Sequence, residues 1–128
     1  MSEEKQPEIE NTIPILCVKD MKASLDYYKN ALGFEWQGWG DTFTSVGRDG
    51  IGMYLCEGSQ GNPGTWVWVG SHDVTRLYEE YKQSGAKIIL PPTNYPHALE
   101  MHVEDLDGHV LRFGSGPLED QPYEEMTA

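Results

Sequence analysis

The fold of this chain is decided by residues 13–34, which read IPILCVKDMKASLDYYKNALGF. The apolar run over residues 13–18 is typical of a buried strand. Asp20 then offers an N-cap, and apolar side chains recur every three or four residues as far as Gly33, which favours a turn. This stretch therefore predicts a strand followed by an amphipathic helix that ends at a glycine.

The same pattern returns later in the chain. Residues 66–69, which read WVWV, predict another strand, and Asp73 offers a second N-cap. Asp20 and Asp73 are 53 positions apart, and so are Tyr28 and Tyr81. Matching caps, helix lengths and spacings indicate an internal repeat.

Each half continues with three strand-like segments. They cover residues 34–39, 42–46 and 51–57 in the first half, and residues 87–90, 99–103 and 110–113 in the second. An Asp-Gly turn lies in each half, and the glycine-rich segment GSQGNPG separates the halves. The order predicts an α+β fold made of two βαβββ repeats.

The chain divides into one domain and two terminal segments. We expect a flexible acidic N-terminal arm over residues 1–11, a single domain over 12–114 with halves 12–57 and 65–114, and an acidic C-terminal tail over 115–128.

The charge of the chain limits its partners. Nine Lys and Arg stand against 21 Asp and Glu, which gives a net charge of −12. This charge disfavours nucleic acid and anionic membranes, and it either concentrates cationic small molecules or only keeps the protein soluble. The polar start of the chain and the lack of a long apolar run predict a cytoplasmic protein. Cys17 and Cys56 lie in apolar runs, which favours free, buried thiols over a disulfide.

Four motifs carry a resemblance to a known family. They are PILCVKD at residues 14–20, SLDYY at 24–28, ALGF at 31–34 and EDLDGHVLRF at 104–113. In this order they resemble the vicinal-oxygen-chelate superfamily of glyoxalases, bleomycin-resistance proteins and extradiol dioxygenases, across residues 12–114. The resemblance implies an open eight-stranded, barrel-like cleft and a homodimer. In the enzymes of this family, the cleft holds a divalent metal.

The resemblance also identifies where the metal ligands would lie. Counted from the two capping aspartates and the closing Asp-Gly turn, these positions are Ile13, Trp66 and Arg112. Isoleucine has no lone pair, the indole nitrogen only donates, and guanidinium is a cation, so none of the three holds a metal. We therefore expect no metal and no cofactor.

One other group of residues has suitable chemistry. Glu100, His102 and Glu104 alternate along a strand and so share one face. They would form a displaced metal site, or Arg112 on the neighbouring strand would pair with one of the carboxylates. If the protein is an enzyme, these four residues are its catalytic candidates. His97 is expected to be an ordinary surface residue.

The leading hypothesis is a metal-free binding protein that sequesters a planar or cationic organic compound. The candidate ligand-binding residues are Ile13, Ile15, Trp36, Trp39, Trp66, Trp68, His102 and Arg112. Two alternatives remain open. One is a lyase, isomerase or dioxygenase-related enzyme with displaced or no metal ligands, and the other is an interaction module without a small ligand.

Overall fold

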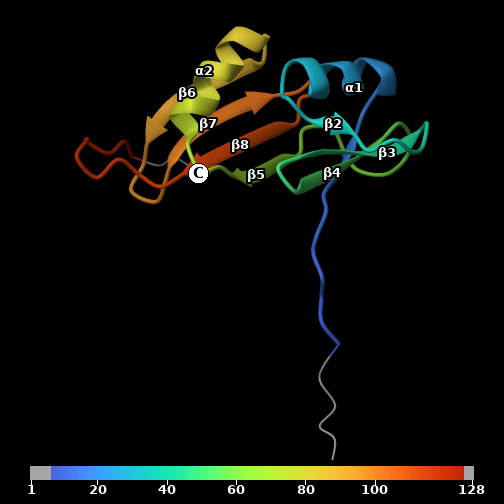
Figure 1. The fold of residues 1–128 in the computed structure, drawn as a ribbon, viewed down its shortest axis with the longest axis horizontal. Coiled ribbons are helices and arrows are strands. Elements are labelled where there is room, and N and C mark those ends of the chain that lie inside the picture. The colour runs from blue at the N-terminus through green and yellow to red at the C-terminus, as the bar shows by residue number, and fades with distance from the viewer. Residues whose placement is uncertain (1–6, 126–128) are drawn as a thin grey trace, which may run out of the picture.

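The computed structural model describes residues 7–125 of the chain. Its helices and strands follow in the order β1 (Ile15–Cys17), α1 (Met21–Asn30), β2 (Glu35–Trp36), β3 (Phe43–Arg48), β4 (Ile51–Cys56), β5 (Trp66–Gly70), α2 (Val74–Ser84), β6 (Lys87–Asn94), β7 (Leu99–Glu104) and β8 (Val110–Ser115), as Figure 1 shows. This order is the βαβββ unit repeated once, so the predicted α+β fold class is confirmed.

The eight strands form two mixed four-stranded sheets, ordered β1-β4-β3-β2 and β5-β8-β7-β6. In each sheet the first strand of the half pairs in parallel with the last strand, and the other neighbours are antiparallel. The helix of each half provides the crossover that a parallel pair requires. The β1–β4 register sets Cys17 opposite Cys56, and both thiols are free.

Both helices begin where the sequence predicted. The carboxylates of Asp20 and Asp73 each accept a hydrogen bond at 3.1 Å from the backbone N–H three residues later. Helix α2 ends at Gly85, whose φ of 86° suits a residue without a side chain. Among the described residues, neither helix combines the length and the apolar character that crossing a bilayer requires.

The strands that differ most from their predicted lengths are β2 and β6. Strand β2 stops at Trp36 because the chain turns through Gly38 and Gly40, which both have positive φ. Strand β6 was predicted to end at Leu90, but it continues through Pro91 and Pro92 to Asn94. Proline is tolerated there because β6 is an edge strand with irregular register, so a missing N–H need not break a ladder.

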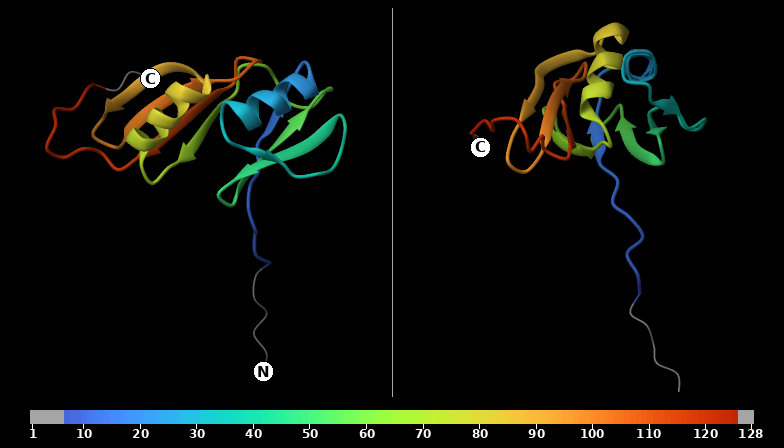
Figure 2. Two further views of the ribbon diagram at one scale, coloured as in Figure 1. Left: turned by 45° about the horizontal axis from the view of Figure 1, so that its top comes forward. Right: turned by 60° about the vertical axis from the view of Figure 1, so that its left-hand side comes forward.

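The hydrophobic core lies between the helices and one face of each sheet. Figure 2 shows the two modules side by side with both helices on the same side of the sheets. Along β7, Leu99, Met101 and Val103 belong to this core, and the residues between them point the other way. We call the helix-covered side of each sheet its inner face and the opposite side its open face.

Two buried tyrosines join the halves reciprocally. The Tyr28 hydroxyl in α1 donates to Asp105 Oδ2 in the second half at 2.8 Å. The Tyr81 hydroxyl in α2 donates to the Leu32 carbonyl in the first half at 2.7 Å. Burial raises the pKa of both tyrosines, so each stays a neutral donor.

His109 adds a third buried connection. Its Nδ1 accepts a hydrogen bond from the Thr65 N–H at 3.0 Å, so the ring proton lies on Nε2. Nε2 then donates to the Cys17 carbonyl at 2.6 Å. The residue is fully buried, and it ties the start of the second half to β1 of the first.

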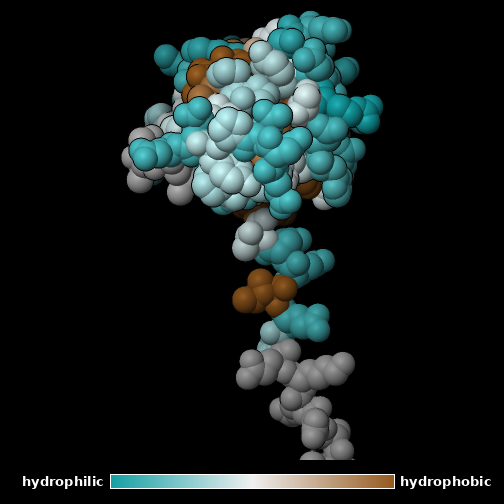
Figure 3. All heavy atoms as spheres, turned by 90° about the vertical axis from the view of Figure 1, so that its left-hand side faces the viewer, coloured by the Kyte–Doolittle hydropathy of each residue, from teal (hydrophilic) through white to brown (hydrophobic). Residues whose placement is uncertain are grey.

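The terminal segments behave differently from one another. Residues 7–12 have no regular structure and extend away from the body, whose mainly hydrophilic face Figure 3 shows. The other part of the predicted N-terminal arm lies outside the described residues. The C-terminal segment instead returns to β6, where the Asn94 side chain accepts from the Leu118 N–H and donates to the Leu118 carbonyl, both at 2.8 Å. Residues 126–128 of the predicted tail lie outside the described range.

Candidate ligand-binding site

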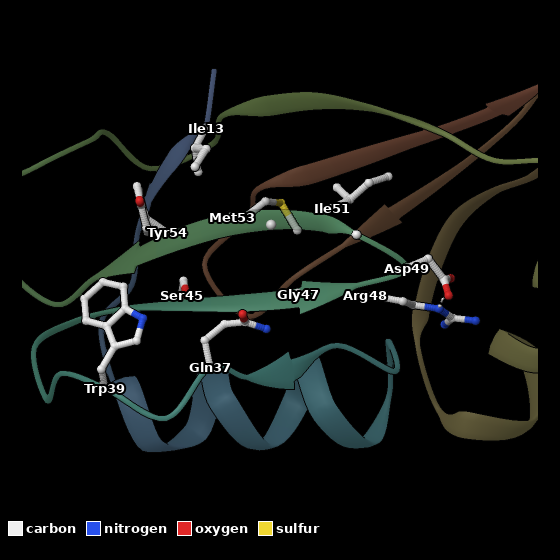
Figure 4. Close-up of a pocket in the computed structure, with 12 residues that line it drawn as sticks. Ile13, Gln37, Trp39, Ser45, Gly47, Arg48, Asp49, Ile51, Met53 and Tyr54 are labelled. Atoms are coloured by element: carbon white, nitrogen blue, oxygen red, sulfur yellow. Dashed lines mark hydrogen bonds and ion pairs between the residues drawn. The ribbon is translucent and has the colours of Figure 1, made fainter. Parts of the chain in front are cut away.

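The first-half open face contains a pocket of about 480 Å³. Its floor is flat because Gly47 of β3 lies opposite Gly52 of β4, so neither strand contributes a side chain there. Figure 4 shows Trp39 and Tyr54 at one end of this pocket, with Ile13 above them. The pocket is therefore a hollow with an aromatic wall at one end.

The aromatic wall is a cluster of three rings. The Trp39 ring centroid lies 6.0 Å from that of Phe43 and 6.0 Å from that of Tyr54. Despite these contacts, Trp39 remains 44% exposed. Ile15 lies opposite Tyr54 in the β1–β4 register and so shares this face. Three of the predicted ligand-binding residues, Ile13, Ile15 and Trp39, thus lie together.

Trp36 lies apart from them. It pairs with Val46, a core residue, so its side chain is directed to the inner face of the sheet. Its indole N–H donates to Thr44 Oγ1 at 2.8 Å and reaches the Trp39 carbonyl at 3.2 Å. Trp36 holds the loop that carries Trp39 and does not line the pocket.

The second-half open face carries the two other tryptophans. Trp66 is 58% exposed and Trp68 is 51% exposed, and strand alternation sets both on the face that Arg112 shares. The Trp68 ring lies over Gly114, where a Cβ atom would overlap it. The Arg112 guanidinium carbon lies 5.6 Å from the Trp68 ring centroid, within the range of a cation–π contact.

Beneath these rings, Glu100 is the centre of an ionic cluster. Arg112 binds it with two nitrogens, Nε to Oε1 at 2.6 Å and Nη2 to Oε2 at 2.9 Å. His102 Nε2 lies 3.0 Å from Oε1, and His97 Nε2 contacts Oε2. The Glu100 side chain has no exposed surface. A sheet face that is otherwise aromatic therefore conceals a fully enclosed carboxylate.

The protonation of this cluster follows from its contacts. Burial alone would raise the pKa of Glu100, but the hydrogen bonds from Arg112, His102 and His97 outweigh burial and lower it to about 2. The carboxylate is thus ionised at neutral pH and only accepts. Each histidine accordingly donates through Nε2, which fixes its tautomer whenever the ring is neutral.

The displaced metal site considered for Glu100, His102 and Glu104 does not form in this cluster. Glu104, which was a potential ligand, binds Lys87 Nζ at 2.7 Å instead of joining Glu100 and His102. Within residues 7–125, no group of three or more His, Cys, Asp or Glu side chains is arranged to hold a metal. The positions that carry the metal in family enzymes hold Ile13, Trp66 and Arg112, and the Arg112 guanidinium is already committed to Glu100. These residues do not fit a divalent ion.

Sequence reasoning missed His97. It lies in the short loop between β6 and β7, which the reciprocal backbone hydrogen bonds of Tyr95 and Ala98 close. This turn folds the imidazole back onto Glu100, three residues later. The spacing from His97 to Glu100 was visible in the sequence, but only the turn shows that the two side chains meet.

The structure contains a second pocket that was not predicted from the sequence. It has a volume of about 780 Å³ and lies between the halves beside the first turns of α2, with Phe34, Val69 and Leu77 among its walls. Arg48 borders it and is paired with Glu80 at 2.6 Å, which lowers the pKa of the Glu80 carboxyl. Arg48 and Glu80 therefore neutralise each other at this junction.

The sequence matches the family described as the Glyoxalase/Bleomycin resistance protein/Dioxygenase superfamily over residues 9–113. The chain belongs to this superfamily. The resemblance that the four motifs carried is thus confirmed. Among curated proteins, no sequence matches the chain significantly.

Solved structures share the fold at low sequence identity. The bleomycin-binding protein from bleomycin-producing Streptomyces verticillus, complexed with copper(II)-bleomycin, is 22% identical, with a TM-score of 0.74 over 87% of this chain and 99% of that one. TnmS3, an antibiotic binding protein from Streptomyces sp. CB03234, is 18% identical, with a TM-score of 0.69 over 88% and 100%. A bleomycin resistance determinant encoded on the transposon Tn5 is 17% identical, with a TM-score of 0.68 over 86% and 100%.

Proposed function

We propose that this protein binds and sequesters a planar organic compound without a metal and without chemical conversion. The observation that carries the proposal is the exposure of Trp39, Trp66 and Trp68 on the open faces of the two sheets. Indole rings bury large apolar areas when they find a partner, and a monomer seldom leaves several of them uncovered on sheet faces. A flat aromatic ligand is the partner that stacks on them.

The solved relatives support this choice of ligand class. Two of them carry names that state bleomycin or antibiotic binding, and a third is a bleomycin resistance determinant. Bulky aromatic antibiotics are the kind of molecule that an aromatic hollow accommodates. We extend the class of ligand to this chain and leave open which compound it binds.

We further propose that the protein acts as a homodimer. Within one chain the two modules lie side by side, so the pocket with Trp39 and the surface with Trp66 and Trp68 belong to separate sheets. A second copy can bring the first-half open face of one chain against the second-half open face of the other. A ligand would then contact aromatic side chains from both sides.

The enzyme alternative is less well supported. A general base needs a free lone pair and a pKa near the working pH. Glu100 is enclosed by three partners, and its pKa is lowered to about 2. Glu104, the other candidate base, is engaged by Lys87. The interaction module is also disfavoured because it predicts a cleft filled by its own side chains, whereas the first-half pocket is open.

Fluorescence titration tests the proposal. Bleomycin and a series of planar compounds are titrated into the protein while Trp emission is followed. We expect saturable quenching, and Trp68→Ala is expected to weaken binding at least about tenfold because it removes a stacking surface.

Tyr78→Leu serves as the control. It also removes an aromatic ring, but from α2 on the helix-covered side of the sheets, so it should leave the affinity nearly unchanged. Equal losses in the two variants, or no quenching by any planar compound, would contradict the proposed site.

A further inference from the structure

The charge that a ligand meets on the second-half open face differs from the charge of the whole chain. The chain carries −12, which suggests a preference for cations. Long-range charge governs the approach of a ligand, whereas the groups within hydrogen-bonding distance decide its orientation. The exposed groups around Trp66 and Trp68 are therefore the ones that matter for recognition.

The carboxylate of this face has no capacity left for a ligand. An ionised carboxylate offers roughly four acceptor sites. Four donors already surround Glu100, namely two nitrogens of Arg112, Nε2 of His102 and Nε2 of His97. Its side chain is also fully buried. A cationic group on a ligand finds neither access nor a free lone pair at Glu100.

The other carboxylate on this face is also engaged. Glu104 accepts a hydrogen bond from Lys87 Nζ at 2.7 Å, and the Lys87 side chain is 64% exposed. This pair lies opposite Val110, towards the other end of β7 from Glu100. Each acid of the second-half open face thus has a basic partner within the chain.

Arg112 is in the opposite situation. Its side chain is one-third exposed, and only Nε and Nη2 are used by Glu100. Within the described residues, its Nη1 makes no hydrogen bond. The guanidinium lies beside the exposed Trp68 ring, so a molecule that stacks on this indole has a free N–H donor at its edge. Arg112 therefore offers a cationic donor on this face, whereas both carboxylates are engaged.

Resting on the binding function proposed above, we propose that the ligand is a planar aromatic acid whose anionic oxygen is bound by Arg112 Nη1 while its rings stack on Trp66 and Trp68. The buried Glu100 holds the guanidinium in place and fixes its orientation. Net acidity of the chain does not conflict with this arrangement, because a charge-assisted hydrogen bond at short range outweighs a field that salt screens.

A matched series of three-ring probes tests the assignment in the unmodified protein. Anthraquinone-2-carboxylate, its neutral carboxamide and cationic 9-aminoacridine are compared by isothermal titration calorimetry. We expect the carboxylate to bind about tenfold more tightly than the carboxamide, and 9-aminoacridine to bind more weakly than either. Tighter binding of 9-aminoacridine than of the carboxylate would overturn the inference while leaving the proposed function intact. If none of the three binds with a Kd below about 1 mM, the proposed function fails as well.

Two double variants test whether Arg112 causes the preference for the carboxylate over the carboxamide. The double variant Glu100→Gln with Arg112→Gln removes the ion pair without leaving a buried charge, and we expect the ratio between carboxylate and carboxamide affinities to fall towards one. The control, Glu79→Gln with Lys82→Gln on the surface of α2, also removes one acid and one base, so the net charge is unchanged as in the first variant, and it should keep the ratio. An unchanged ratio in the first variant would assign the preference to another residue. If that variant fails to fold, the probe series in the unmodified protein still shows whether the site prefers an anionic or a cationic ligand.

Discussion

The two open faces of this protein differ far more than its two inner faces. On the inner faces, each helix starts at an aspartate and contributes a buried tyrosine at the same position of the repeat. On the open faces, the first half has a glycine floor and an aromatic wall, whereas the second half has an ionic cluster beneath two indoles.

The difference indicates where each half is constrained. The inner faces must fill one shared core, so similar side chains recur at equivalent positions. The open faces need not pack against the body, and they can differ without unfolding the chain. Ligand recognition is expected to depend on the open faces, which differ between the halves, and stability on the inner faces, which are alike. Glu100 is the exception, because it lies on an open face and yet is expected to matter for stability.

The largest expected effect on stability concerns Glu100. Arg112→Gln alone leaves Glu100 buried without its cation and should destabilise the protein by about 3–5 kcal/mol. Lys82→Gln removes the partner of Glu79, which is 58% exposed, so the cost there should be at most about 1 kcal/mol. Urea unfolding of both variants measures the difference. Similar losses would mean that Glu100 reaches solvent.

Lowering the pH is expected to have an intermediate effect on stability. The pKa of Glu100 is lowered to about 2 in the folded protein, so its stabilising contribution is complete above its ordinary pKa of 4.5 and is lost as the pH falls towards 2. Between about pH 6 and about pH 3, the stability advantage of the unmodified protein over the Glu100→Gln, Arg112→Gln double variant should shrink.

We expect this loss to reach about 2 kcal/mol near pH 2, less than the full pKa difference gives, because solvent screens the exposed parts of Arg112 and His97. Urea unfolding at a series of pH values measures it. A constant difference between the two proteins across this range would show that Glu100 is not held ionised by these partners.

The smallest expected effect compares the two glycine positions. Gly114→Ala places a Cβ in the Trp68 ring, and since this half-exposed ring can move outwards, the cost should be about 1 kcal/mol. A Cβ at Gly52 would meet only the Val46 carbonyl oxygen, at an ordinary contact distance of 3.6 Å, so Gly52→Ala should change stability by less than about 0.5 kcal/mol. Thermal unfolding measures both, and a larger loss for Gly52→Ala would reverse the comparison.

Most of the fold could be read from the sequence because its signals are local. Asp20, Asp73 and Gly85 act on the backbone within one turn, and strand alternation fixed the shared face of Trp66, Trp68 and Arg112. The pairing of Arg112 with a carboxylate, one of two alternatives, also follows from neighbouring strands.

The remaining part of the site depends on non-local geometry. The face that Trp36 occupies is set by its pairing with Val46, a register that a strand of two residues does not reveal in the sequence. The contact between His97 and Glu100 depends on the turn between β6 and β7. The return of the C-terminal segment depends on Asn94, a single amide in an edge strand.

The reciprocal tyrosines have a consequence for how the molecule comes apart. Each half supplies the hydroxyl that satisfies a polar atom of the other, and His109 adds a bond to β1. Separating the modules would strip partners from both sides at once, at sites that water does not reach in the folded chain. The repeat is therefore twofold in architecture but a single cooperative unit in thermodynamics, and neither module is expected to persist alone.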